Sequence, residues 1–451
     1  MNIHLKDNRR YYLSQSQDKD SSRFILREEQ FKILSKLPNP LTTDNLEGVE
    51  FIEQYEKKES ETLILKRVTK DGETYLQTGN MIGEFYFKAT EKTIHQISIG
   101  LRFEKDNSNE LLEYLLNYTN AIYPDKVDFG TKDETKSKTN SIIKILLSNM
   151  FTHSISKAHV LGLPTIYQEI YEKDYNIRGR IDINRLISQE LPFKGKTPYI
   201  KNERLVVESI GVVLLKAIDI IQYNVNSSFP NLSQIKSSLK QAGIRNYIDT
   251  KIIKDALNHK ILNHPSFYEY KNTLYLASLI IKGFKIPKPT EMKSLFYGYL
   301  VDVSKIWENF LIKLLEQNIT DEWKILHEPP LPLFKNKPNL FELTNVMYPD
   351  IVLINESKKQ AMIFDAKFKS SQWFNREDFY KTATYVSYYK NQGYEVILSG
   401  QIYPDKDADK INENLGFLNS DTDFRFFGID LIDEIINKNE CSFINEISGK
   451  Y

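Results

Sequence analysis

Two short apolar runs in the last third of the chain, DIVLI (350–354) and AMIF (361–364), are separated by a polar turn and bounded by carboxylates. Short apolar runs on either side of a polar turn predict an antiparallel β-hairpin. In this hairpin Asp350 starts the first strand and Asp365 ends the second, so both carboxylates reach one edge. Lys367 lies two residues after Asp365, so its side chain leaves the strand on the same face.

This trio of side chains suits the hydrolysis of a phosphodiester. Carboxylates on rigid strands suit Mg²⁺, which keeps several waters and accepts one or two protein carboxylates together with phosphate oxygens. An ammonium group beside a metal-bound water orients that water and stabilises the charge on a pentacoordinate phosphate. The trio therefore predicts a metal-dependent nuclease site.

An acid two residues before a lysine is common in this chain, so Asp365 and Lys367 must be compared with the other copies. Those copies lie in polar or helical surroundings, which favours solvated surface: Glu56/Lys58, Glu134/Lys136, Asp249/Lys251, Glu291/Lys293, Glu322/Lys324 and Glu356/Lys358. The tripeptide YPD is also repeated, ending at Asp125, Asp350 and Asp405. Only Asp350 is followed by a strand that ends in an acid and a lysine, so the other two aspartates are predicted to be dispensable.

The surrounding sequence predicts one α/β domain over 290–451, because helices and short strands alternate in the order α-β-β-β-α-β. The expected elements are a long amphipathic helix over 292–318, strands over 323–334, 346–354 and 360–368, a helix over 375–392, and strands over 394–404 and 423–431.

The first part of the chain predicts a β-rich domain over 1–129 and a mainly helical domain over 130–289, so the fold class is α+β multidomain. The signals are a hairpin over 61–78 around Asp71-Gly72, a helix over 109–118, helices over 141–159 and 202–224 with a strand-like stretch at 175–185, a helical group over 229–281, and a Pro/Gly linker at 282–289.

The bulk composition excludes several classes of protein. Lys and Arg number 60 against 60 Asp and Glu, so the net charge is zero and broad electrostatic capture of DNA is not expected. The single cysteine, Cys441, rules out an internal disulfide and a Cys-rich zinc module. No apolar run is long enough to cross a membrane, so we expect a cytoplasmic protein.

The pattern Pro349-Asp350 followed by Asp365-Ala366-Lys367 resembles the PD-(D/E)XK nuclease superfamily. Such nucleases often carry an acid on the helix before the hairpin, and IWENFL offers Glu308 for that position. The resemblance implies that Asp350, Asp365 and Glu308 bind Mg²⁺, with Mn²⁺ as an alternative ion. Glu308 could equally be a solvated helix acid.

A finer likeness connects the chain with the McrC family, the nuclease subunits of methylcytosine-dependent restriction systems. FDAKFK resembles that family's DAKYK element, and REDFYKTATYVSYYK resembles its ED-(I/L)-YQ…Y helix at Asp378, Tyr380 and Tyr385. IHQISIGLRF and IRGRIDINRL resemble two weaker segments nearer the amino terminus. The chain departs from the family at Lys381, where Gln is usual, and at Leu101-Arg102, where the family has PK.

The resemblance implies a catalytic role for Lys381 beside the trio and a partner, a McrB-like AAA+ GTPase hexamer that recognises modified double-stranded DNA and translocates. The partner must be a separate subunit, because Gly195-Lys196-Thr197 lacks the upstream glycine of a P-loop. Docking is expected within residues 1–290, so a fragment ending near Gly283 should still bind the partner. Two alternatives stay open: a non-catalytic adaptor that activates the motor, and a stand-alone DNA nuclease.

Overall fold

The computed structural model describes the chain in segments. These are residues 1–13, 24–47, 49–51, 62–70, 72–90, 92–103, 110–119, 142–189, 192, 195–224, 230–283, 294–332, 346–369, 376–404, 422–431, 443–445 and 447. The chain divides into two units, one formed by Met1–Lys138 together with Lys288–Tyr451 and the other by Thr139–Pro287. Among the described residues, no helix combines the length and the apolar character that crossing a bilayer requires.

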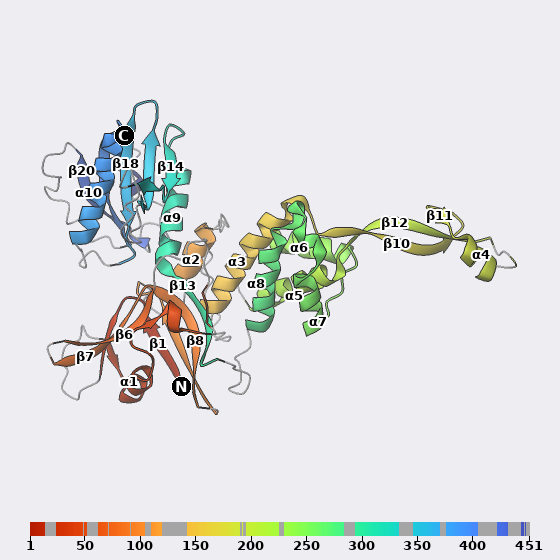
Figure 1. Cartoon of the computed structure of the whole chain (residues 1–451), viewed down its shortest axis with the longest axis horizontal. Helices are drawn as coiled ribbons and strands as arrows, with labels where there is room; N and C mark the ends of the chain where they lie inside the picture. Colours follow the sequence, from red (N-terminus) through yellow and green to blue (C-terminus); the bar gives the residue numbers. More distant parts are fainter. Residues whose placement is uncertain are drawn as a thin grey trace, which may run out of the picture. The chain divides into compact units, whose positions relative to one another are not determined.

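Two five-stranded sheets form the amino-terminal part of the first unit (Figure 1). The first sheet has the order β1 (Asn2–Lys6), β9 (Thr93–Gly100), β8 (Met81–Thr90), β13 (Phe296–Asp302), β5 (Val49–Phe51). The second has the order β3 (Phe24–Leu26), β2 (Arg10–Leu13), β7 (Glu73–Thr78), β6 (Leu63–Lys70), β4 (Leu41–Thr42). Their apolar faces and the helix α1 (Glu28–Leu34) share one core.

The hairpin expected over 61–78 is confirmed. Strands β6 and β7 pair from Leu65 and Thr78 to Lys70 and Glu73. Gly72 in the turn has a φ of 80°, a conformation that glycine adopts without strain. The helix expected over 109–118 is confirmed as α2 (Glu110–Thr119).

The long helix expected over 292–318 is wrong in its first half. Phe296–Asp302 forms β13, which pairs antiparallel with β8 and parallel with β5. Gly298 allows the close approach to β8, because a Cβ atom there would lie 2.3 Å from the carbonyl oxygen of Glu84. The helix α9 (Val303–Asn318) begins only after Asp302, whose side chain accepts a hydrogen bond of 2.9 Å from the Ser304 amide.

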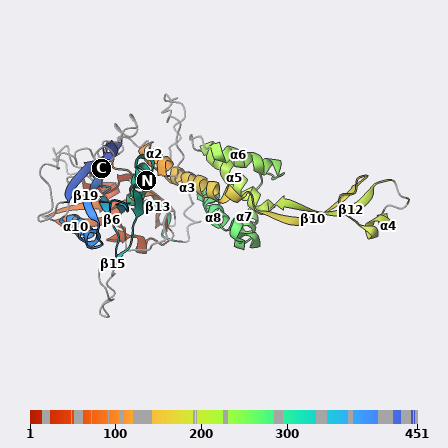
Figure 2. The same ribbon diagram turned by 90° about the horizontal axis from the view of Figure 1, so that it is seen from above.

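The second unit combines helices with a three-stranded sheet of order β10-β12-β11. Its elements are α3 (Ile142–Ala158), β10 (Thr165–Asp174), β11 (Arg180–Ile181), α4 (Ile183–Gln189), β12 (Thr197–Val206), α5 (Glu208–Asn224), α6 (Pro230–Gln241), α7 (Thr250–Leu257) and α8 (Tyr270–Gly283). We call β10, β11, α4 and β12 the arm. Figure 2 shows the arm running away from α5, α7 and α8, with α4 at its far end.

Two predictions in this unit need correction. The helix expected over 202–224 begins only at Glu208, because the residues up to Val206 belong to β12, which pairs with β10 along its whole length. The strand-like stretch expected at 175–185 contains only the two residues of β11, and its last residues start α4.

A five-stranded sheet forms the carboxy-terminal part of the first unit, with the order β14 (Lys324–His327), β17 (Ile351–Asn355), β18 (Gln360–Ala366), β19 (Glu395–Tyr403), β20 (Asp423–Gly428). The first three strands are antiparallel and the last three parallel. The short pair β15 (Leu331–Pro332) and β16 (Val346–Met347) lies apart from this sheet.

The helix α10 (Arg376–Asn391) packs on this sheet, where Tyr385, Val386 and Tyr389 join a core with Val352 and Ile363. Tyr385 and Tyr389 therefore serve the packing of α10 on the sheet. With these helices and sheets, the chain has the expected α+β class.

Candidate functional site

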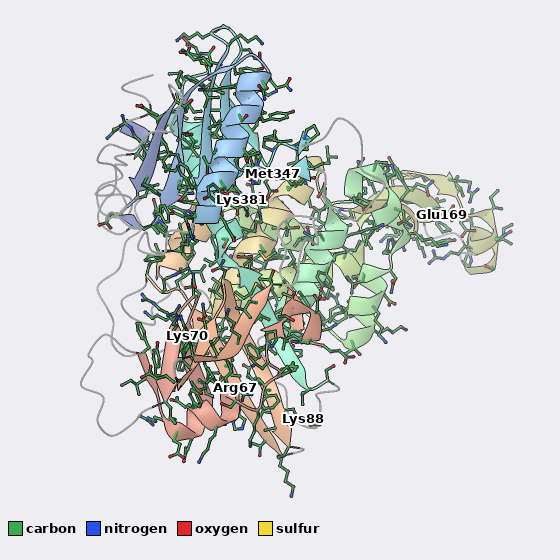
Figure 3. The ribbon with its side chains drawn as sticks, turned by 60° about the vertical axis from the view of Figure 1, so that its left-hand side comes forward. Arg67, Lys70, Lys88, Glu169, Met347 and Lys381 are labelled. Carbon is green, nitrogen blue, oxygen red and sulfur yellow. The ribbon has the colours of Figure 1, made fainter. Side chains whose placement is uncertain are left out.

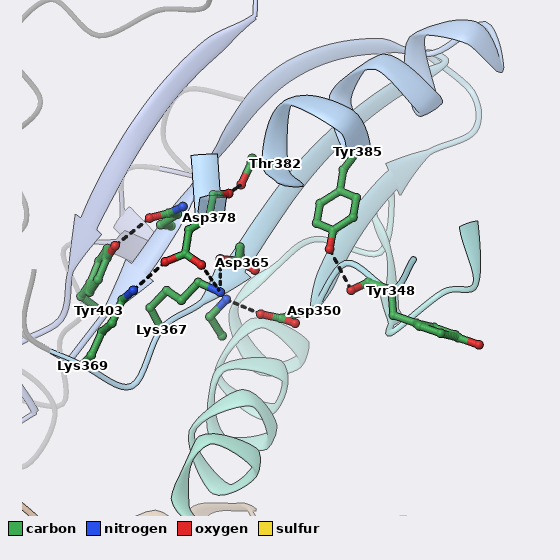
Figure 4. Close-up of polar contacts among 11 residues, drawn as sticks. Tyr348, Asp350, Asp365, Lys367, Lys369, Asp378, Thr382, Tyr385 and Tyr403 are labelled. Atoms are coloured by element: carbon green, nitrogen blue, oxygen red, sulfur yellow. Dashed lines mark hydrogen bonds and ion pairs between the residues drawn. The ribbon is translucent and has the colours of Figure 1, made fainter. Parts of the chain in front are cut away.

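The β17–β18 hairpin brings two carboxylates to one edge of the sheet. Ile351 pairs with Phe364, so Asp350 and Asp365 follow as the next opposed positions. Asp350 is also bonded to the last residue of β18, because its Oδ2 accepts a hydrogen bond of 2.6 Å from the Ala366 amide. Figure 4 shows both carboxylates beside Lys367.

Lys367 is the cation at the centre of this cluster. Its Nζ lies 2.6 Å from Oδ2 of Asp365 and 3.6 Å from Oδ1 of Asp378, and its side chain is 19% exposed. Its backbone amide donates a hydrogen bond of 2.9 Å to the carbonyl of Ile402 on β19. Lys367 is therefore held by main chain and side chain while it remains within reach of a substrate.

Asp378 lies in the first turn of α10 and was not singled out as a site residue from the sequence. Its Oδ2 lies 2.6 Å from Nζ of Lys369, and Figure 4 shows its carboxylate directed at both lysines. Burial works to raise the pKa of Asp378, but Lys367 and Lys369 hold it below its usual value. The only sequence signal was its place in the helix that resembles the McrC family.

Asp350 and Asp365 have raised pKa values, so both are harder to ionise than a free aspartate. Burial raises the pKa of Asp365 to about 7, with a further contribution from the charge of Asp350. Burial and the charge of Glu308 raise the pKa of Asp350 to about 6. Burial works to lower the pKa of Lys367, but Asp365, Asp350 and Asp378 raise it above its usual value. The site thus contains more negative charge than one ammonium offsets.

Glu308 belongs to this cluster and is not a solvated helix acid. It is 6% exposed on α9, and burial raises its pKa to about 7 against the opposing effect of Lys305. Nζ of Lys305 lies 2.8 Å from Glu308 and 2.6 Å from Glu328. The ammonium of Lys305 is therefore shared between Glu308 and a second acid.

Glu308 also belongs to a second group of potential metal ligands, together with His327 and Glu328. One ligand atom each from Glu308, His327 and Glu328 lie within 4.8 Å of one another. Burial lowers the pKa of His327, which favours the neutral imidazole. Lys305, His327 and Glu328 were not predicted as site residues. Lys305 lies on α9 itself, and the end of β14 brings His327 and Glu328 close to it.

Lys381 lies apart from the trio's direct contacts. Its side chain is exposed on α10 (Figure 3), and its charge contributes to the lowered pKa of Asp378. On the same helix, Tyr385 Oη donates a hydrogen bond of 3.2 Å to the carbonyl of Tyr348, which fixes the approach to Asp350. The structure thus places Lys381 where it faces solvent beside the site.

The remaining sequence features fall elsewhere. Asp125 and Asp405 lie outside the described residues. Thr197 starts the strand β12, and Nζ of Lys196 lies 5.3 Å from the ring centre of Tyr175. A P-loop needs a helix to begin at this point, so Gly195-Lys196-Thr197 is a chance match to the end of a P-loop motif.

The oxygen donors of the site fit a small hard cation. Asp350, Asp365 and Glu308 are carboxylates on two strands and one helix, and all three have pKa values raised by burial. A buried carboxylate is stabilised by pairing or by a bound cation. Mg²⁺ accepts such ligands together with several waters, so the residues fit this ion.

Comparisons with known proteins found a matching family model and similar solved structures. The family model described as "McrBC 5-methylcytosine restriction system component" matches residues 76–404. No curated protein matches. The solved structures that are similar to the chain include two assemblies from one archaeon. One is the refined half-complex from a tetradecameric assembly of Thermococcus gammatolerans McrB AAA+ hexamers with bound McrC, with 12% identity, coverage of 95% of this chain and 94% of that chain, and a TM-score of 0.44. The other is the cryo-EM structure of the Thermococcus gammatolerans McrBC complex, with 13% identity, coverage of 71% and 89%, and a TM-score of 0.31.

Proposed function

The chain belongs to the family of McrBC 5-methylcytosine restriction system components, and from this premise we propose that it is the metal-dependent DNA endonuclease subunit of such a system. The observation that carries the proposal is the cluster of the buried Asp365 with the half-buried Asp350 and Lys367 at one end of the β17–β18 hairpin. A protein that only activates a motor has no use for charged groups that are costly to bury at this point. The adaptor alternative is therefore less favoured.

The metal would be held by Asp350, Asp365 and Glu308, with Mg²⁺ as the expected ion and Mn²⁺ as an alternative. When bound, the ion would activate a water and polarise the scissile phosphate. Lys367 orients a water molecule at its exposed edge and stabilises negative charge that develops on the phosphate. The Ala366 amide keeps Asp350 in one orientation, because its hydrogen bond fixes one of the two carboxylate oxygens.

The substrate is proposed to be double-stranded DNA that carries a modification, in line with the 5-methylcytosine restriction family. The chain has zero net charge, so it gains little affinity from the phosphate backbone alone. We therefore infer that recognition and movement along DNA depend on an AAA+ GTPase partner of the McrB kind, which this chain in turn stimulates.

The arm is the best candidate for the surface that meets this partner. Large apolar side chains stand in solvent along it: Tyr167, Tyr171, Tyr175, Ile181, Ile183 and Ile187. Tyr167 and Tyr171 lie four residues apart on β10, so they share one face. Exposed apolar side chains gathered in one part of a protein mark an interaction surface.

A fragment that ends near Gly283 is not a clean test of docking. A fragment that ends near Gly283 would lose β13, which lies between β8 and β5 in the first sheet. The loss would disturb the fold whether or not that fragment docks. Substitutions on the arm of the full chain are the better test.

Cleavage by matched variants tests the catalytic proposal. Purified chain is mixed with a McrB-like AAA+ GTPase, GTP, Mg²⁺ and methylated plasmid. Asp365→Asn should abolish cleavage while the partner's GTP hydrolysis is still stimulated. Glu356→Gln is the control, because Glu356 forms an exposed ion pair of 2.7 Å with Lys359 at the other end of the same hairpin. Cleavage by Asp365→Asn at the control's rate would remove the nuclease assignment and favour the adaptor.

A further inference from the structure

Asp7 and Arg102 form a buried ion pair just beyond the ends of β1 and β9, two neighbouring strands of the first amino-terminal sheet. Strands β1 and β9 are parallel, with Lys6 beside Gly100, so Asp7 and Arg102 emerge close together. Nη2 of Arg102 lies 2.8 Å from Oδ2 of Asp7, and the Arg102 amide donates a hydrogen bond of 2.6 Å to Oδ1. The two side chains are 5% and 0% exposed. This pair is therefore part of the interior and not a surface contact.

The same guanidinium reaches the segment that carries the catalytic lysine. Nη2 of Arg102 donates a hydrogen bond to the carbonyl of Phe368, 266 residues away in the sequence. Phe368 lies between Lys367 and Lys369, and its ring centre is 5.4 Å from the Arg102 guanidinium. The amino-terminal sheet thus holds the main chain directly beside the residue that is proposed to contact the phosphate.

The ring of Phe368 ties this segment to the helix of Glu308. It lies 6.0 Å from the ring of Trp307, the neighbour of Glu308, and 5.3 Å from the ring of Phe103. Phe368 is 3% exposed, so little space is left for it to move. A change in the position of Phe368 would therefore act on both flanking lysines.

The amino-terminal sheet also determines where α9 begins. Strand β13 lies within that sheet, and α9 follows it without a break at Asp302 and Val303. The Val303 amide donates a hydrogen bond of 3.0 Å to the carbonyl of Asn80, which precedes β8. Glu308 and Lys367 are therefore attached to the same sheet through two independent connections.

The plain explanation, that Asp7 and Arg102 only stabilise the fold, does not account for this arrangement. The desolvation of two buried charges offsets much of their attraction, so a buried ion pair is weak evidence for stability. An apolar pair would fill the space without that cost. What an apolar pair cannot supply is a donor for the Phe368 carbonyl.

We propose that Arg102 is a positioning residue, which holds the Phe368 carbonyl so that Lys367 stays aligned with Asp365. This inference rests on the proposed nuclease function. Arg102 acts through the main chain and does not touch the substrate. Its loss should therefore reduce the rate of the chemical step and leave DNA affinity unchanged, because a small misplacement of a catalytic group costs up to about a hundredfold in rate.

The test uses the full chain with its GTPase partner and methylated DNA. Arg102→Ala should lower the maximal cleavage rate by about tenfold or more, with the DNA concentration at half-maximal rate changed by less than about twofold. Millimolar guanidinium ion should restore part of the rate in this variant. Arg102→Lys keeps a charge opposite Asp7 but has a single compact donor group, so it should fold and still cut slowly.

Two controls separate positioning from general damage. Arg67→Ala removes a guanidinium that donates a bond of 3.1 Å to the Ser35 carbonyl, far from Lys367 in sequence; Figure 3 shows its position on β6. Ile3→Ala weakens the core shared by the amino-terminal sheets, because Ile3 is fully buried there. Both should cut within about threefold of the parent chain.

Amide hydrogen exchange at Lys367 provides a readout besides cleavage. This amide is bonded to Ile402, and its protection should fall in Arg102→Lys but not in Ile3→Ala. Arg102 variants that cut and exchange like Ile3→Ala would overturn the inference. If the parent chain and Asp365→Asn cut equally, the nuclease function fails instead, and the exchange result still decides whether Arg102 positions this segment.

Discussion

Replacing Asp365 with Asn should make the metal-free protein more stable while it abolishes cleavage. Asp365 is fully buried and its pKa is raised from 3.8 to about 7, so the folded state binds a proton that the unfolded state releases. The folded state is therefore favoured in full below about pH 4, and this contribution is lost as the pH rises through about 7. At about pH 8 the folded protein must hold a buried carboxylate that water would solvate better.

The size of the effect follows from the two pKa values. One pKa unit corresponds to about 1.4 kcal/mol, so the difference between 3.8 and about 7 sets an upper limit of about 4 kcal/mol. This limit already includes the ion pair of 2.6 Å with Lys367, which lowers the pKa, but an Asn amide does not keep every contact of the carboxyl group, which subtracts from the gain. We expect a net gain of about 2 kcal/mol at about pH 8, which raises the Tm by about 4 °C for a unit of this size.

Thermal unfolding in EDTA at about pH 8 and about pH 5 measures this gain. The gain should shrink at about pH 5, because Asp365 is then protonated in the folded protein and costs less to bury. Glu356→Gln, at the exposed end of the hairpin, should raise the Tm at neither pH. A Tm that falls in Asp365→Asn at the higher pH, or a gain that is equal at both, would show that burial does not strain this carboxylate.

The remaining predictions concern the lysine, the duplicated motif and the arm. Lys367→Met should reduce cleavage by about a hundredfold or more with an unchanged circular dichroism spectrum, since the side chain serves the reaction and not the core; near-normal cleavage would exclude its proposed role. Asp125→Ala and Asp405→Ala should each change the cleavage rate by less than about tenfold, which corresponds to about 1.4 kcal/mol in the barrier; a larger loss in a folded variant would mean that another YPD copy carries the site. Tyr167→Ser combined with Ile183→Ser should weaken binding to the GTPase in a pull-down without altering the Tm, and full binding by this variant would remove the arm as the docking surface.

The hairpin of the site could be predicted because its information is local. The runs DIVLI and AMIF and the polar turn between them fix both the strands and their register, and the register places Asp350 opposite Asp365. The helix α10 was predictable for the same reason, since its buried positions recur at helical spacing. These parts required no knowledge of distant residues.

The parts that were missed depend on pairing between distant segments. Residues 296–302 have apolar side chains at spacings that suit a helix or a buried strand, and only the gap between β8 and β5 selects the strand. The contact of Arg102 with Phe368 spans 266 residues, so no local pattern predicts it. The sequence pointed to Asp378 only through the family resemblance of its helix. Its contacts depend on Lys367 and Lys369 lying beside the first turn of α10.

Anomalous diffraction from crystals soaked in Mn²⁺ tests the central claim most directly, because it locates the ion that the nuclease mechanism requires. We predict a peak bound by carboxylate oxygens of Asp350 and Asp365, at about the 2.0–2.3 Å typical of small hard cations, and no peak there in Asp365→Asn. A peak confined to Glu308, His327 and Glu328, or Mn²⁺ that binds equally well without the Asp365 carboxylate, would contradict the proposed site.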